Sequence, residues 1–140
     1  MENELILKKR YPILQIIANF LTFCFFVLLV VAIALWITSI NKFASTHSLS
    51  TQEIIKKWTS ILSSSELIQL KNANFLLLAS SIFYVISLIF AIIINAIITY
   101  AAYKNNWKNI LIFSALGIFV FRLSGFIVGI ILLKKIFTNR

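Results

Sequence analysis

The sequence contains little charge and very few acidic residues: there is no aspartate, and four glutamates stand against thirteen lysines and arginines. Charged residues make up 12% of the chain and hydrophobic residues 61%. A water-soluble globule of 140 residues with this composition would lack the polar side chains needed to cover its surface. The high hydrophobicity also excludes a disordered chain. We therefore expect an integral membrane protein.

The residue types that usually carry chemistry are also scarce. Cys24 and His47 are the only residues of their kinds, so the sequence offers neither a disulfide framework nor the converging ligands of a metal site. Cys24 lies within the first apolar stretch and His47 beyond its end, which argues against a nucleophile–base pair. The sequence has no carboxylate pair and no glycine-rich phosphate loop. We expect no enzyme activity, no metal and no cofactor.

Three long stretches of the sequence are free of charge apart from Arg122. They contain 31, 32 and 25 residues, more than the ~20 that cross a bilayer core and fewer than the ~40 of a two-pass hairpin. Three segments cannot close a barrel, so helices are the spanning structure that satisfies their backbone in lipid. We predict an all-α integral membrane protein: residues 1–140 form a single membrane domain, with a small bundle of three transmembrane helices at residues 13–40, 73–103 and 110–133.

The basic residues bear on partners and on orientation. They cluster at the ends of the spans and in the first loop, without the contiguous basic and aromatic face of a nucleic-acid-binding protein. Anionic lipid headgroups are their expected partners. Three spans leave five basic residues on the N-terminal side and seven on the other. The triplet Lys8, Lys9 and Arg10 precedes the first helix, so we favour a cytoplasmic N-terminus, an external C-terminus and a multi-pass protein of the cell membrane.

The loop of residues 41–72 contains two capping boxes, Ser50 with Glu53 and Ser63 with Glu66. They predict a helix that breaks near residues 63–65 and restarts. Apolar residues recur at helical spacing along it: Ile54, Trp58, Ile61 and Ile68.

The predicted loop helix contains three adjacent residues, Lys56, Lys57 and Trp58, that suit a membrane surface. Two interpretations of this helix have equal weight. The first is an amphipathic helix that lies in the headgroup layer or against a partner. The second is a loop helix that packs over its own bundle, since amphipathicity alone does not separate the two.

Arg122 is the chemically unusual residue, because it lies at the middle of the predicted third span. An arginine at that depth costs about 2.5–3.5 kcal/mol, which the surrounding aliphatic residues offset. A buried guanidinium keeps its charge and needs several acceptors, and the predicted spans contain no acid. Its acceptors must be neutral side chains, water, lipid phosphate or a carboxylate on another chain.

Polar and small residues form stripes on the predicted spans. An antiparallel pairing of the second and third spans brings Arg122 to the depth of Asn95, and Asn19 of the first span lies on the same side of the membrane. We predict an intramembrane polar cluster of Arg122, Asn95 and Asn19, with Ser87 and Tyr84 as alternative partners. The third span also has a stripe of residues suited to close helix packing, which are Ala115, Ile118, Gly125 and Gly129.

The leading hypothesis is a non-catalytic, structural or accessory subunit of a larger membrane complex. It docks through the face of Arg122, Gly125 and Gly129 onto a partner with an intramembrane acidic residue. The first alternative is a self-associating pore or transporter component in which Arg122 lines an anion or polar pathway. The second is a regulatory or immunity-type membrane protein with a single partner. Packing of the glycines within the chain itself is the plain structural interpretation.

Overall fold

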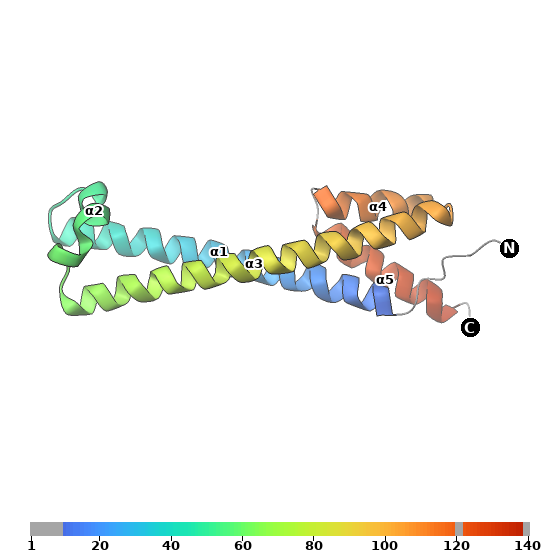
Figure 1. Ribbon diagram of the computed structural model, residues 1–140, viewed down its shortest axis with the longest axis horizontal. Helices are drawn as coiled ribbons and strands as arrows, with labels where there is room; N and C mark the ends of the chain where they lie inside the picture. The colour runs from blue at the N-terminus through green and yellow to red at the C-terminus, as the bar shows by residue number, and fades with distance from the viewer. Residues whose placement is uncertain (1–9, 120–121, 139–140) are drawn as a thin grey trace. The chain divides into compact units, whose positions relative to one another are not determined.

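The computed structural model describes residues 10–119 and 122–138, and within them the protein is helical with no strand (Figure 1). The all-helical part of the predicted fold is therefore confirmed. The helices are α1 (Arg10–Thr46), α2 (Thr51–Ile61), α3 (Ser64–Lys104), α4 (Lys108–Phe119) and α5 (Arg122–Thr138).

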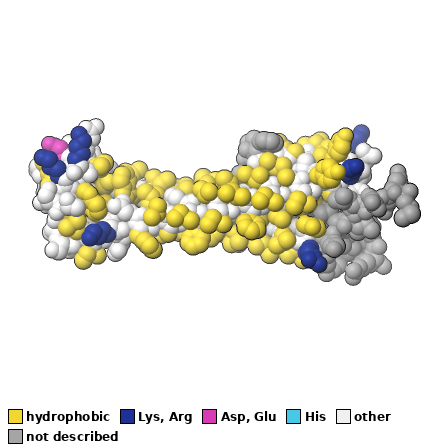
Figure 2. All heavy atoms as spheres, in the orientation of Figure 1, with side chains coloured by type: hydrophobic (Ala, Val, Ile, Leu, Met, Phe, Trp, Pro, Cys, Tyr) yellow, Lys and Arg dark blue, Asp and Glu magenta, His cyan; other side chains and the backbone are white. Residues whose placement is uncertain are grey.

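Helices α1 and α3 are long and apolar enough to cross a membrane. They contain 37 and 41 residues and include the predicted spans 13–40 and 73–103. Their large apolar side chains are mostly exposed, among them Phe20 on α1 and Phe90 on α3. Figure 2 shows hydrophobic side chains along both helices and basic side chains near the helix ends. Such exposed apolar surface suits a helix surrounded by lipid and not a helix in water.

The chain divides into two compact units. Residues 26–83 form one of them, which we call the loop unit. Residues 1–25 and 84–140 form the other, which we call the terminal unit. Helices α1 and α3 each contribute residues to both units.

The prediction of one continuous helix over residues 110–133 is wrong. Helix α4 ends at Phe119, α5 begins at Arg122, and the two lie side by side in opposite directions (Figure 1). A Cβ atom on Gly117 would lie 3.1 Å from the backbone nitrogen of Gly125, whereas eight residues of one helix extend ~12 Å. The cause is the small residues on facing turns, which let the two helix backbones approach closely and pack within the chain.

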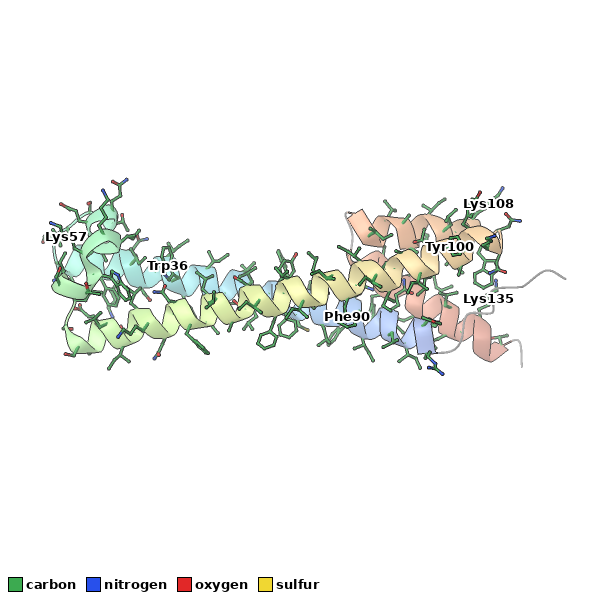
Figure 3. All side chains as sticks on the ribbon, viewed as in Figure 1. Trp36, Lys57, Phe90, Tyr100, Lys108 and Lys135 are labelled. Carbon is green, nitrogen blue, oxygen red and sulfur yellow. The ribbon has the colours of Figure 1, made fainter. Side chains whose placement is uncertain are left out.

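The middle of α5 lies beside the start of α1 within the terminal unit. A Cβ atom on Gly129 would lie 3.0 Å from the carbonyl oxygen of Pro12. The Lys135 ammonium lies 4.1 Å from the ring centroid of Trp107, just before α4. Figure 3 shows Lys135 at the same end of this unit as Lys108. The expectation of an external C-terminus rested on a continuous third helix and loses its basis.

Both predicted capping boxes are present in the loop unit. The carboxylate of Glu53 accepts from the backbone N–H of Ser50 at 2.9 Å, and the Ser50 hydroxyl accepts from the backbone of Glu53. Glu66 and Ser63 repeat this exchange, with the first bond also at 2.9 Å. The predicted break is confirmed, because α2 ends at Ile61. The restarted helix is the beginning of α3 itself.

The apolar face of α2 packs on the chain's own helices. Ile54 is fully buried in a cluster with residues of α1 and α3, and Trp58 packs at its edge. Lys56 and Lys57 are exposed, so of the two interpretations the packed loop helix describes this face. Ile68 is exposed and does not share the apolar face of Ile54 and Trp58, because it lies on α3 and not on α2.

Candidate functional site

Three amide side chains form a buried polar cluster in the terminal unit, which we call the amide cluster. Gln15 and Asn19 come from α1 and Asn95 from α3, and each is at most 2% exposed. The Gln15 Nε2 donates to Asn95 Oδ1 at 2.8 Å. Asn19 and Asn95 exchange two further hydrogen bonds, of 3.3 and 3.2 Å. The structure therefore brings together two of the three residues of the predicted cluster and adds Gln15.

Helix geometry explains how α1 contributes to this cluster. Gln15 and Asn19 are four residues apart and lie on one face, so both reach the same neighbour on α3. Asn19 Nδ2 also donates to the backbone carbonyl of Gln15 at 2.7 Å. A buried amide is costly without partners, and in a lipid-embedded helix pair each interhelical bond contributes about 0.6 kcal/mol, up to about 2 kcal/mol. The cluster contains no titratable group, so it suits a fixed helix register better than proton transfer.

Two glycines bring the backbones of α4 and α5 onto the amide cluster. A Cβ atom on Gly125 would lie 2.7 Å from both amide atoms of Asn19 and 2.8 Å from Asn95 Oδ1. One on Gly117 would lie 3.2 Å from Asn95 Nδ2. A side chain at Gly125 would therefore force the amide groups of Asn19 and Asn95 to shift out of their hydrogen bonds. Gly117 was not singled out from the sequence, because its spacing to Gly125 fits a continuous helix as well as two facing helix turns.

The predicted helix-packing stripe is largely used inside the chain. Gly125 packs on the amide cluster, and Gly129 packs on α1, where a Cβ atom would lie 2.5 Å from Cγ1 of Ile16. Ala115 and Ile118 are half-buried. The glycine face proposed for docking is therefore covered by the protein's own helices, as the plain packing interpretation requires.

A second polar contact joins α4 to α3 next to the cluster. The Ser114 hydroxyl, fully buried, donates to the backbone carbonyl of Asn95 at 3.1 Å. It also lies 3.0 Å from the hydroxyl of Thr99. Ser114 was not singled out from the sequence.

The remaining residues of the predicted cluster are not shown to join it. Arg122 is the first residue of α5, and its side chain lies outside the described residues. Ser87 is buried and donates to the backbone carbonyl of Tyr84 at 3.0 Å, within α3. The prediction that Arg122 contacts the asparagines stays a prediction.

One acceptor in the cluster lacks a partner among the described residues, the Oε1 atom of Gln15. An unpaired buried carbonyl costs about 1–3 kcal/mol. The side-chain nitrogen of Gln15 thus stabilises the cluster with one hydrogen bond, while its side-chain oxygen is a buried acceptor without a partner among the described residues.

The groups with shifted pKa values lie outside the amide cluster, in the loop unit. The backbone N–H of Ser50 holds the pKa of Glu53 below its usual value, with help from the Ser50 hydroxyl. The backbone N–H of Ser63 does the same for the pKa of Glu66. The carboxylate of Glu66 also lies close to the ring of His47, with 3.0 Å between Oε2 and Nε2.

Comparison with known proteins adds no further guide to function. No family model matches the chain, and no curated protein and no solved structure is similar to it. Among the described residues, no group of three or more histidine, cysteine or acidic side chains is placed to hold a metal ion. The function therefore has to be argued from geometry and charge.

Proposed function

We propose that this chain is an integral membrane protein that crosses the membrane twice, through α1 and α3. The length and the exposed apolar side chains of these helices support this. Helices α4 and α5 enter and leave from one side. At 1.5 Å per residue, the 12 residues of α4 reach ~18 Å, beyond the headgroup layer of about 5–7 Å but short of the ~30 Å core.

The hairpin of α4 and α5 also changes the charge count that sets orientation. Both termini now share one side with eight lysines and arginines, while the loop carries four. The side with more basic residues near the spans is normally cytoplasmic. We propose that both termini are cytoplasmic and that the loop of residues 41–72 is external.

Within the membrane, the protein acts as a non-catalytic accessory subunit of a larger assembly. The observation that carries this proposal is that α5 begins at Arg122, the residue next to the reversal of the hairpin. The first N–H groups of a helix lack intrahelical partners and attract negative charge, and the guanidinium is permanently charged. In the proposed topology the end of α4 and the start of α5 lie at membrane depth, where the unpaired backbone groups of a helix end need a cover of protein or water.

A partner helix with an aspartate or glutamate would meet both needs, because it covers the backbone and supplies the missing anion. The apolar segments of this chain contain no acid, so the anion has to come from elsewhere. The proposed docking surface is the end of the hairpin at Arg122. It replaces the face of Gly125 and Gly129, which the chain's own helices occupy.

Purification of the full chain from its native membrane in mild detergent tests the proposal. We expect a stoichiometric partner with an intramembrane acid, lost in Arg122→Gln and retained in Lys135→Gln, a control cation at the opposite end of α5. A wild-type protein that purifies without a partner would overturn the proposal, as would equal loss in both variants.

The first alternative is a self-associating pore or transporter component, in which water, and not a partner protein, covers the end of α4 and the start of α5. In that case the chain purifies as a homo-oligomer, and liposomes show anion flux that Arg122→Ala abolishes. In the regulatory or immunity-type alternative the partner is present, and deletion of this chain raises the activity or toxicity of that partner.

A further inference from the structure

The loop unit contains a groove of about 350 Å³ between α1 and α3. One end is polar and the other apolar. The residues that line it are Leu35, Thr38, Ser39 and Lys42 of α1 and Gln69, Asn72, Ala73 and Leu76 of α3.

The polar end presents hydrogen-bond donors that are not used elsewhere. Lys42, Gln69 and Asn72 are exposed, and their side chains make no hydrogen bond or ion pair within the described part of the chain. Thr38 and Ser39 donate their hydroxyl protons to backbone carbonyls of α1, at 2.7 and 2.8 Å. One ammonium and two amide groups thus remain available for an acceptor-rich anion.

The apolar end of the groove, formed by Leu35 and Leu76, lies closer to the middle of α1 and α3 than the polar end does. Leu35 is seven residues from Lys42, ~10 Å along α1. Lys42 is the first charged residue after the uncharged stretch of α1, and Lys71, next to Asn72, is the last before that of α3. The groove therefore covers the point where the apolar part of both helices ends, over a length similar to a headgroup layer and the first carbons beneath it.

An indole marks the same level. The ring N–H of Trp36 donates to the side-chain oxygen of Asn74, and these two residues directly follow the groove residues Leu35 and Ala73 in the sequence (Figure 3 labels Trp36). Tryptophan is enriched where headgroups meet acyl chains.

We propose that this groove binds one anionic phospholipid, whose phosphate contacts Lys42, Gln69 and Asn72 and whose acyl chain follows Leu35 and Leu76. This inference rests on the proposed membrane insertion but not on the partner at Arg122. Charge complementarity favours an anionic over a zwitterionic lipid, because the loop unit carries four lysines against two glutamates. Both glutamates already serve as helix caps. The apolar half of the groove favours a lipid over free phosphate.

Native mass spectrometry of the full chain, released from nanodiscs that contain phosphatidylglycerol and phosphatidylcholine, tests the inference. We expect phosphatidylglycerol to stay bound. Lys42→Gln should lower its retention about five-fold, since a lysine near an anionic lipid surface contributes about 1 kcal/mol. Lys57→Gln is the matched control, because Lys57 is an exposed lysine of the same unit outside the groove, and it should leave retention unchanged.

The other outcomes decide against the groove. Equal loss in Lys42→Gln and Lys57→Gln would mean diffuse attraction to the surface, and equal retention of phosphatidylcholine would remove the preference for an anion. Displacement of the lipid by millimolar inorganic phosphate would identify a site for free phosphate. Leu76→Asn separates the two sources further, since it should weaken the phospholipid and spare inorganic phosphate. These results do not depend on whether a partner co-purifies, so each proposal fails separately.

Discussion

Asn19 and Asn95 hydrogen-bond to each other in both directions, each side-chain nitrogen donating to the other's oxygen. Asn95 Oδ1 accepts from Gln15 as well. A shift of α1 against α3 by one residue turns Asn19 away by 100° and breaks all of these bonds at once. In helices that are otherwise mostly apolar, this exchange specifies a register that apolar packing alone would leave degenerate.

The first prediction concerns the coupling of these two residues. Asn19→Leu and Asn95→Leu should each destabilise the protein, and the double variant should cost less than the sum by about 0.5–2 kcal/mol. Unfolding in mixed detergent micelles measures the cycle. Asn19→Leu paired with Asn72→Leu, an exposed amide of the loop unit, is the control and should be additive. Additivity in the first cycle would show that the exchange contributes nothing.

The second prediction concerns Gln15, whose oxygen has no partner among the described residues. Gln15→Met removes one hydrogen bond but also an unsatisfied buried acceptor, so the two effects largely cancel. We expect a change in unfolding free energy within about 1 kcal/mol, clearly smaller than that of Asn95→Leu. A loss as large as that of Asn95→Leu would mean that Oε1 is satisfied, for instance by a bound water.

Much of the fold follows from the sequence because hydropathy and capping are local signals. The charge-free stretches identify the helices that contain residues 13–40 and 73–103, and Ser50 with Glu53 identifies the start of α2. The proximity of Asn19 to Asn95 follows from the spacing of polar residues in two antiparallel helices. These inferences need only hydropathy, capping residues and the period of the helix, which can all be read from short segments of sequence.

The hairpin of α4 and α5 could not be predicted in this way. Hydropathy measures whether a segment prefers lipid, and it is blind to a reversal of direction within an apolar segment. The residues on either side of the reversal, Phe119 and Arg122, include no glycine or proline that would mark a helix end. The docking role given to Gly125 and Gly129 had a related weakness, since a pair of small residues predicts close packing without saying which helix packs there, and here the chain's own helices do.

The third prediction tests the close approach at Gly125. Gly125→Ala introduces a Cβ atom 2.7 Å from the Asn19 amide, so the gain of up to about 1 kcal/mol in helix propensity should be outweighed by about 1–3 kcal/mol of overpacking. Ala96→Leu, at an exposed position beside Asn95 on α3, is the control and should be neutral. Thermal unfolding in detergent compares the two. A stabilised Gly125→Ala variant would contradict the observed packing of α5 on α1.

The fourth prediction uses the capping box of α2. Because hydrogen bonds from Ser50 lower the pKa of Glu53 from its ordinary 4.5, the cap stabilises α2 above that value and is lost as the pH falls through the lower, folded-state pKa. Hydrogen exchange of the first turn of α2 should therefore accelerate below about pH 4.5 relative to the intrinsic rate. Glu53→Gln should remove this pH dependence, while Lys56→Gln should keep it. A pH response that survives in Glu53→Gln would assign it to another group.

The last prediction distinguishes a hairpin from a third span. In a Cys24→Ser background, cysteines at Asn109, before most of α4, and at Thr138, the last residue of α5, should react with a membrane-impermeant maleimide from the same side. A cysteine at Gln52 on α2 should react from the other side. The reason is that α4 and α5 together return to their starting level, as the packing of Gly129 on Pro12 requires. Labelling of Thr138→Cys together with Gln52→Cys, and opposite to Asn109→Cys, would restore the continuous third span and move three of the eight basic residues to the loop side, which would remove the case for cytoplasmic termini.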